Sequence, residues 1–326
     1  MNEIFYWPYE LRSKGTLNSR RSATTHHGCL IRIGAGVGCL HPWVELGDRP
    51  LSDQLEILRS GRETDLIRSA RECARLDGEA REEGRSLFHL AGSPMSQPRN
   101  HWLASPKDDP AVVRAEGFRK VKLKVGPFLD EVSGAIDRWR RKGFRVRLDA
   151  NESVPFREWV NWWLDLPSGI RDAIDWVEDP CPWGRWRWKF LQSIGIPVAA
   201  DRDVGERLFS SDVAVYKMAT DGSDPQENAL DTRLIGWAAR REGRRLSVTS
   251  YMDHAVGQMW AVYAAGCFET VASDILDHCG LLTHLRFEKD SFFEQVRFED
   301  TRIVPPGGTG LGFDDLLEKL PWKRLT

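Results

Sequence analysis

Three acidic residues end short apolar runs at similar spacing along the chain. Asp149, Glu178 and Asp201 each end such a run, and the steps between them are 29 and 23 positions. Carboxylate oxygens are the ligands that Mg²⁺ prefers in proteins, with water and substrate completing its coordination. One such acid could equally cap a following helix, but three acids at matching positions are hard to explain in that way. The pattern therefore predicts a site for a hard cation.

Lysines lie on candidate strands on either side of these acids. Lys122 and Lys124 alternate with apolar residues, so the two-residue period of a strand puts both on one face. Lys217 ends the run 213–217 and shares its face with the valines of that run. Each lysine alone would most simply face water, and inward lysines are costly unless they meet anions. Beside three acids, they indicate a catalytic site.

The elements that must position these residues alternate between short apolar runs and longer, charged, helix-like segments. The candidate strands are 119–125, 144–149, 173–178, 197–200, 213–217, 246–250 and 270–275. Such alternation favours βαβ units and a parallel sheet, and steps of 23 to 29 residues fit the roughly 30 residues per unit of a closed barrel. No GxGxxG follows the first strand, which argues against dinucleotide binding. Barrel enzymes carry their catalytic groups at the carboxyl ends of the strands, where these acids lie.

The chain before the barrel pattern has a different character. Its first ninety or so residues indicate an α+β unit with short strands at 28–33 and 37–41 and helices at 51–59 and 64–85. A segment rich in glycine and proline then marks a boundary. The predicted domains are an α+β capping domain, a barrel, and a tail that returns to the cap. Their bounds are 1–95 for the cap, 96–295 for the barrel and 296–326 for the tail.

Composition excludes several classes of function. The 326 residues carry a formal net charge of −2, so bulk electrostatics indicates no nucleic-acid partner. The six cysteines form no CxxC pair and are expected to be reduced. The absence of a signal peptide and of any apolar stretch of ~20 residues predicts a cytoplasmic protein with no membrane partner. The eight histidines form no HxH pair, which argues against a zinc hydrolase barrel. Composition leaves the oligomeric state open between a monomer and a small homo-oligomer.

The order of the chemical groups, Lys-x-Lys, Asp-x-Asn, Glu-Asp-Pro, Asp and Lys, resembles the enolase superfamily and its muconate-lactonizing-like subgroup. Three segments, 147–151, 250–257 and 279–283, resemble the o-succinylbenzoate synthase family within it. The resemblance implies an α/β fold: a modified TIM barrel, (β/α)7β, with an α+β capping domain. It also implies Mg²⁺ as cofactor, with Mn²⁺ able to substitute, held by Asp149, Glu178 and Asp201.

The same resemblance implies the roles of further residues. Lys124 would be the base, Lys122 its electrostatic partner, and Lys217 would face the substrate from the other side. The implied substrate-binding residues are Arg20 on a cap loop, Arg147, Asn151, Ser250, Gly257 and Gly280. The chain departs from its relatives at two positions. Arg202 follows Asp201 where an acid is usual, which leaves Asp203 as an alternative ligand, and Tyr251 stands where a second serine is often found.

The implied activity acts on a small-molecule carboxylate. It is the Mg²⁺-dependent syn dehydration of 2-succinyl-6-hydroxy-2,4-cyclohexadiene-1-carboxylate to o-succinylbenzoate in menaquinone biosynthesis. Lys124 would abstract the α-proton to give a metal-stabilised enediolate. Two alternatives stay open: an N-acylamino-acid racemase or dipeptide epimerase on the same scaffold, and a barrel retained as a non-catalytic binding module.

Overall fold

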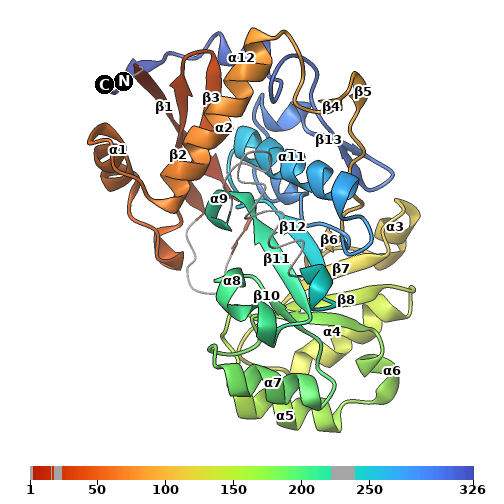
Figure 1. Cartoon of the computed structure of the whole chain (residues 1–326). Coiled ribbons are helices and arrows are strands. Elements are labelled where there is room, and N and C mark those ends of the chain that lie inside the picture. Colours follow the sequence, from red (N-terminus) through yellow and green to blue (C-terminus); the bar gives the residue numbers. More distant parts are fainter. Residues whose placement is uncertain (1–2, 16, 18–23, 222–238) are drawn as a thin grey trace.

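A parallel sheet of seven strands forms the barrel, and most of these strands are labelled in Figure 1. The computed structural model describes residues 3–15, 17, 24–221 and 239–326. The strand order is β12-β11-β10-β9-β8-β7-β6, and each neighbouring pair is parallel. The strands are β6 (Trp102–Leu103), β7 (Lys120–Lys124), β8 (Arg145–Asp149), β9 (Ile174–Glu178), β10 (Val198–Ala200), β11 (Val213–Lys217) and β12 (Arg245–Thr249). Sequence order therefore equals spatial order, as repeated βα units require.

An eighth segment joins the two edges of this sheet. Parallel bridges connect Leu276 and Gly280 to β12, and another connects Cys279 to Asn100, just before β6. Backbone hydrogen bonds from Cys279 N to Arg99 O (2.8 Å) and from Gly280 N to Val248 O (2.8 Å) continue both contacts. The segment 276–280 thus closes the sheet, and the predicted (β/α)7β barrel is confirmed.

One predicted strand is wrong. The run 270–275 was expected to be the last barrel strand, but the helix α11 (Ala255–Val271) extends into it. This helix is apolar on nearly every side, because it is buried between β12 and the cap strand β3 (Gly36–Leu40). An apolar run without a polar face gives no period by which a helix differs from a strand.

Helices cover the outside of the barrel. They are α3 (Pro110–Ala115), α4 (Asp130–Arg140), α5 (Phe156–Asp165), α6 (Ser168–Arg171), α7 (Arg185–Ser193), α8 (Val204–Arg207), α9 (Met218–Asp221) and α11, with the 3-10 turns η2 (Leu208–Ser210), η3 (Thr283–Arg286) and η4 (Phe293–Gln295). Tryptophans anchor several of them: Trp139 on α4, Trp159 and Trp163 on α5 and Trp188 on α7 are all buried. The outward faces of the strands are apolar for this reason, which leaves the inward faces free to carry polar groups.

A second, antiparallel sheet forms the cap, at the upper left of Figure 1. Its order is β15-β1-β2-β3. The cap elements are β1 (Ile4–Arg12), β2 (Thr25–Ile33), β3, β15 (Lys323–Arg324), η1 (Val44–Leu46), α1 (Leu51–Arg59) and α2 (Asp65–Glu82), and the remaining short elements are β4 (His89–Leu90), β5 (Ser93–Pro94), β13 (Arg297–Glu299), β14 (Arg302–Val304) and α12 (Asp314–Leu317). The side chain of Thr64 caps α2 by accepting a hydrogen bond from Ile67 N, and α2 packs on β3.

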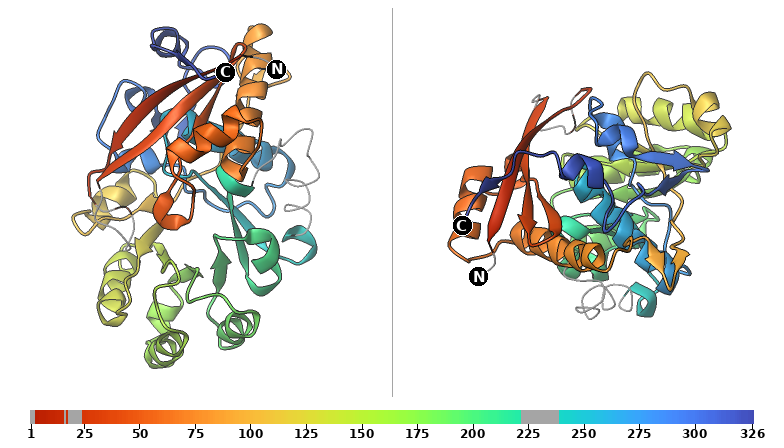
Figure 2. Two further views of the ribbon diagram at one scale, coloured as in Figure 1. Left: turned by 90° about the vertical axis from the view of Figure 1, so that its left-hand side faces the viewer. Right: turned by 90° about the horizontal axis from the view of Figure 1, so that it is seen from above.

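The C-terminal tail lies beside the first strand. Figure 2 shows the blue end of the chain running along the red N-terminal strands, where β15 pairs with β1 through Phe5 and Arg324 and through Tyr6 and Lys323. The domain bounds given above stay a prediction. No helix in the described ranges is long and apolar enough to cross a membrane.

Candidate active site

Adjacent strand ends bring a lysine and two acids together at one rim of the barrel. In the register of the sheet Lys124 lies opposite Asp149, and Asp149 opposite Glu178. Asp201 follows directly after β10, the next strand. Because parallel strands end at the same edge, four groups separated by up to 77 positions in the sequence share one region.

Lys122 holds the first two acids. Its Nζ lies 2.6 Å from Glu178 Oε1 and 3.1 Å from Asp149 Oδ2. Burial alone would lower the pKa of Lys122, but Asp149, Glu178 and Asp201 outweigh this and hold the pKa above its usual value. Lys122 is therefore a fixed positive charge beneath the site.

Lys124 has the opposite shift. It ends β7, its ammonium donates to the carbonyl of Leu17, and its side chain stays accessible to solvent. Surrounding protein removes part of the hydration of its charge, which lowers the pKa of Lys124. Lys122 adds to this effect, although Asp149 opposes it. An accessible lysine with a lowered pKa is suited to accept a proton.

Lys217 and Asp201 form the other side of the site. The Lys217 ammonium donates to Asp201 Oδ2. Asp201 Oδ1 is buried and has no hydrogen-bond partner among the residues that the structure describes. The side chain of Asp203 is 66% exposed and pairs with Arg207 instead. Geometry thus favours Asp201 over Asp203 as the acid that faces the barrel.

The three acids repel one another. Burial, followed by the charges of Asp201 and Asp149, raises the pKa of Glu178 even though Lys122 acts against the shift. Lys122 and Lys124 lower the pKa of Asp149 despite its burial. A bound cation would relieve this repulsion, and Asp201 Oδ1 is an oxygen still available to it. Within the described residues no three His, Cys, Asp or Glu side chains converge closely enough to hold a metal, and lysines pair with the three carboxylates. The donor set nevertheless fits Mg²⁺.

Two predicted substrate-binding residues lie near this rim. Asn151 Nδ2 donates to Asp149 Oδ1 at 2.6 Å, so it also orients that carboxylate. Ser250 follows β12, is 3% exposed, and exchanges a hydrogen bond with the Thr283 hydroxyl. Arg20, predicted on the cap loop, lies outside the described residues.

Arg147 has a different place from the one expected. Its side chain is 0% exposed and lies inside the barrel below Asp149. Its guanidinium contacts Asp175 (2.9 Å), Asp277 (2.8 Å) and His101 Nδ1 (2.6 Å), and stacks over the Trp176 ring with its carbon 3.5 Å from the ring centroid. These internal partners occupy the guanidinium, so the geometry argues against the predicted contact with substrate.

The two predicted glycines are also engaged in packing. A Cβ on Gly257 would lie 2.1 Å from Asp253 Oδ2 and 3.0 Å from Cys39 Sγ, so this glycine admits the cap against α11. Gly280 donates its N–H to Val248 O and accepts from Thr249 Oγ1 at 3.0 Å. Both backbone groups of Gly280 thus serve the barrel in this structure.

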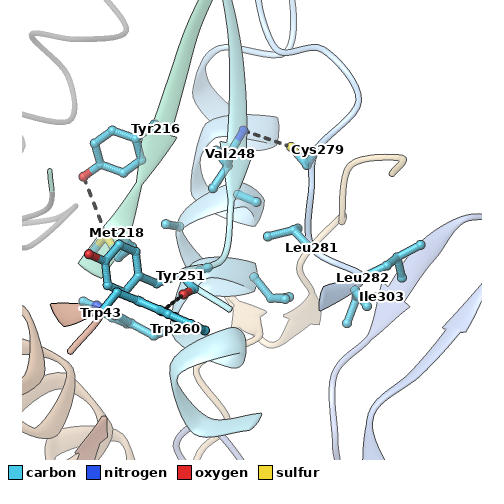
Figure 3. Packing of buried hydrophobic residues seen from close by; sticks show 14 of the residues in the cluster. Trp43, Tyr216, Met218, Val248, Tyr251, Trp260, Cys279, Leu281, Leu282 and Ile303 are labelled. Carbon is cyan, nitrogen blue, oxygen red and sulfur yellow. Dashed lines mark hydrogen bonds between the residues drawn. The ribbon is translucent and has the colours of Figure 1, made fainter. Parts of the chain in front are cut away.

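Sequence reasoning missed the seam between cap and barrel. Trp43 Nε1 donates to Tyr251 O at 2.7 Å (Figure 3), and the Tyr251 hydroxyl donates to Asp48 Oδ2 at 2.9 Å. Burial raises the pKa of Asp48, and the charge of Lys217 opposes the shift. The contact of Lys124 with the Leu17 carbonyl was missed as well. Backbone carbonyls and residues from a distant domain carry no local sequence signal.

Comparison with known proteins identifies the family of the chain. Residues 4–80 match the family model of the o-succinylbenzoate synthase N-terminal domain, and residues 109–316 match the enolase C-terminal domain-like family. The o-succinylbenzoate synthase of Bdellovibrio bacteriovorus is 32% identical over 340 aligned positions, covering 100% of this chain and 99% of the relative.

Solved structures share the fold. Muconate lactonizing enzyme from Pseudomonas fluorescens superposes with a TM-score of 0.76 at 18% identity, covering 95% of each chain. Dipeptide epimerase from Enterococcus faecalis, in complex with Mg and a dipeptide, gives a TM-score of 0.73 at 17% identity, covering 96% of this chain and 99% of that one.

The fold and the matched family models define an enzyme of the enolase superfamily. Within it, the full-length relative and the matched N-terminal domain show that the chain belongs to the o-succinylbenzoate synthase family of lyases.

Proposed function

We propose that this chain converts 2-succinyl-6-hydroxy-2,4-cyclohexadiene-1-carboxylate into o-succinylbenzoate and water, a step of menaquinone biosynthesis. The full-length relative supports this reaction. The observation that carries it is the placement of Lys124 and Lys217 on either side of three carboxylates at one rim of the barrel. Asn151 and Ser250 are the proposed contacts to the substrate.

Lys124 begins the reaction as a base. Its lowered pKa increases the neutral fraction that can take the hydrogen next to the substrate carboxylate. Lys122, held protonated by its carboxylate partners, keeps positive charge next to it. Lys217 donates from the other side, where negative charge develops.

Asp149, Glu178 and Asp201 would hold Mg²⁺, with Mn²⁺ able to substitute. When bound, the cation supplies positive charge that stabilises the substrate carboxylate as the α-proton leaves. The unpartnered Oδ1 of Asp201 and the mutual repulsion of the acids support this ligand set.

The second half of the reaction returns the proton. Lys124, now an ammonium, donates it to the ring hydroxyl, and the C–O bond breaks as water leaves. The lost hydrogen and hydroxyl depart from one face because one lysine serves both, which makes the elimination syn. The ring becomes aromatic, so this half is strongly favourable.

A turnover assay tests the proposal. The diene absorbance of the substrate should fall and o-succinylbenzoate should accumulate when Mg²⁺ is present, and excess chelator should stop both. A folded protein that binds Mg²⁺ but leaves the diene unchanged would rule out this reaction while leaving the family assignment intact.

A second candidate function rests on Lys217. An N-acylamino-acid racemase or dipeptide epimerase needs a proton-transferring group on each face of the substrate, and Lys124 and Lys217 supply such a pair. Incubation of acylamino acids and dipeptides in D₂O tests it: exchange of the α-hydrogen with loss of configuration would establish this activity.

We also propose that the molecule divides into a cap, 1–95 with 296–326, and a barrel, 96–295. The pairing of β15 with β1 and the closure of the barrel by 276–280 support these bounds.

A further inference from the structure

Arg207 contacts three loops at once, although the mechanism above gives it no part. It ends α8 and is 7% exposed. Its Nη1 lies 2.8 Å from Glu152 Oε1 and 3.6 Å from Asp179 Oδ1. Its Nη2 lies 3.0 Å from Asp203 Oδ2. One planar guanidinium thus meets three carboxylates, which a compact ammonium could not span.

Each of these carboxylates belongs to a residue shortly after a proposed metal ligand. The pairs are Asp149 and Glu152, Glu178 and Asp179, and Asp201 and Asp203. Arg202 also approaches two of these carboxylates, with its Nη1 3.7 Å from Glu152 Oε2 and its Nε 3.8 Å from Asp179 Oδ2. The three loops that follow β8, β9 and β10 meet at the Arg207 guanidinium. Indole rings enclose it further, with the guanidinium carbon 5.8 Å from the Trp183 ring centroid and 5.5 Å from that of Trp188.

The loops are also tied to one another. Glu152 N donates to Asp179 O at 2.7 Å, and Asp201 N donates to Asp179 Oδ1 at 3.2 Å. Asp179 is 2% exposed. A displacement of its carboxylate would therefore move the backbone of Asp201 as well as lose the contact with Arg207.

The backbone at these positions is strained. Asn151, Glu152, Asp179 and Asp203 have φ values of 48°, 60°, 41° and 44°. Residues with a side chain adopt this left-handed region rarely, and it persists where surrounding contacts hold it. Three of the four are the residues whose carboxylates meet Arg207.

We propose that Arg207 is a positioning residue, which holds the three strand-end loops in the arrangement from which Asp149, Glu178 and Asp201 would bind one cation. The inference rests on the proposed function for the identity of the ligands. It predicts that loss of the guanidinium weakens cation binding without removing any ligand.

The test measures cation affinity directly. Calorimetric titration of Mg²⁺, or electron paramagnetic resonance of Mn²⁺, is performed on the full chain without substrate. Arg207→Gln should raise the dissociation constant ~10–100-fold, as loss of groups that orient metal ligands does. Arg207→Lys should give a smaller increase, because it keeps the charge but not the fork. At low Mg²⁺, both variants should turn over much more slowly than the wild type. At saturating Mg²⁺, their kcat should return towards the wild-type value.

Arg81 offers a matched control. It is also an enclosed arginine, 13% exposed, with its Nε 2.6 Å from Asp77 Oδ2, but it lies on α2 in the cap. Arg81→Gln should lower thermal stability and leave the Mg²⁺ dissociation constant unchanged. Equal loss of affinity in Arg81→Gln and Arg207→Gln would reduce the effect to general destabilisation and overturn the inference.

Glu152→Gln is the second variant should Arg207→Gln fail to fold. It removes one carboxylate of the cluster at constant size and should also raise the Mg²⁺ dissociation constant. Unchanged affinity in a folded Arg207→Gln or Glu152→Gln protein overturns the inference. Failure of the proposed function looks different, since the wild-type chain itself would then leave the diene substrate unconverted while the variants still lost Mg²⁺ affinity. A wild-type chain that binds no Mg²⁺ overturns both.

Discussion

Two lysines on one strand have pKa values shifted in opposite directions because their neighbours differ. Lys122 points between Asp149 and Glu178 and is held charged. Lys124 lies two residues further along the strand, closer to the rim. Its ammonium has lost part of its hydration there and donates to a carbonyl rather than to a carboxylate. The Lys-x-Lys spacing therefore places a fixed cation beside a base, and the cation itself lowers the pKa of that base.

Removal of the base should abolish turnover. Lys124→Ala is expected to remain folded, because the side chain is accessible, and to lose at least ~10³-fold in kcat, since proton abstraction by a positioned group is lost. In the wild type, kcat/KM should rise with pH as Lys124 loses its proton, with an apparent pKa below the usual value of about 10.4. Turnover of the diene substrate across pH measures both. Substantial activity in folded Lys124→Ala would contradict the assignment.

The buried carboxyl of Asp253 is expected to make the free energy of unfolding depend on pH. Its carboxyl is 5% exposed, its Oδ1 has no partner among the described residues, and burial raises its pKa to about 7. Between about pH 4, the unfolded value, and pH 7, the folded state binds more protons than the unfolded state. The free energy of unfolding contributed by this group must therefore fall as pH rises through that window.

Asp253→Asn removes this dependence, because the amide resembles the protonated acid in shape and carries no charge. The variant should be more stable than wild type at pH 8 by roughly 1–3 kcal/mol, the scale of an unsatisfied buried polar group, and the difference should shrink towards pH 5. Denaturant unfolding at both values measures it. A constant difference across pH would show that Asp253 does not titrate in this window.

At the scale of elements, the cap depends on close approach between a strand and a helix. A Cβ on Gly38 of β3 would lie 1.9 Å from Ala70 O of α2. A side chain at Gly38 would force β3 and α2 apart. The atom in the way belongs to the backbone of α2, which cannot rotate aside as a flexible side chain could. The same strand also packs on α11. This helix begins shortly after Ser250, so the packing of the cap helps to position the Ser250 loop.

Gly38→Ala should destabilise the protein by about 1–3 kcal/mol through this overpacking. Gly134→Ala is the control, since Gly134 lies in α4 and nothing stands within 4 Å of its Cβ position. That change should be neutral or stabilise by roughly 0.5–1 kcal/mol. Thermal melts of both variants decide the point. Similar melting temperatures would mean that α2 moves away from β3 at little cost.

At the scale of the whole molecule, metal and fold are linked. The proposed ligands come from three strands that must all be in place, so a cation that binds the folded state alone stabilises the entire barrel. The lysines that now bind these carboxylates would lose part of their attraction when it enters. A melting experiment measures the difference between these two effects on the free energy of unfolding.

Mg²⁺ should raise the melting temperature of the wild type, by an amount equivalent to about 2.7 kcal/mol at one hundred times the dissociation constant. Asp149→Asn should reduce this stabilisation strongly, because it removes one anionic ligand. Melts with Mg²⁺ and with excess chelator test this. An equal Mg²⁺ effect in the wild type and in Asp149→Asn would count against this ligand set.

The sequence by itself determined the barrel strands from β7 to β12 and the rim at which they end. The helix at 51–59 has the predicted bounds, and the strands that end at Asp149, Glu178 and Lys217 follow from short apolar runs. Because parallel strands share one carboxyl edge, local pattern was enough to bring acids and lysines together.

Only the tertiary structure decided which partner each polar group has. Arg147 has the same strand face as Asp149, yet it meets an interior cluster around Asp175 and Asp277. Lys124 meets the carbonyl of Leu17, 107 positions away, and Arg207 gathers loops from three strands. The strand expected at 270–275 belongs partly to α11, whose apolar surface is explained only by burial on both sides. Such contacts join residues distant in the chain, and they depend on packing that no local period records.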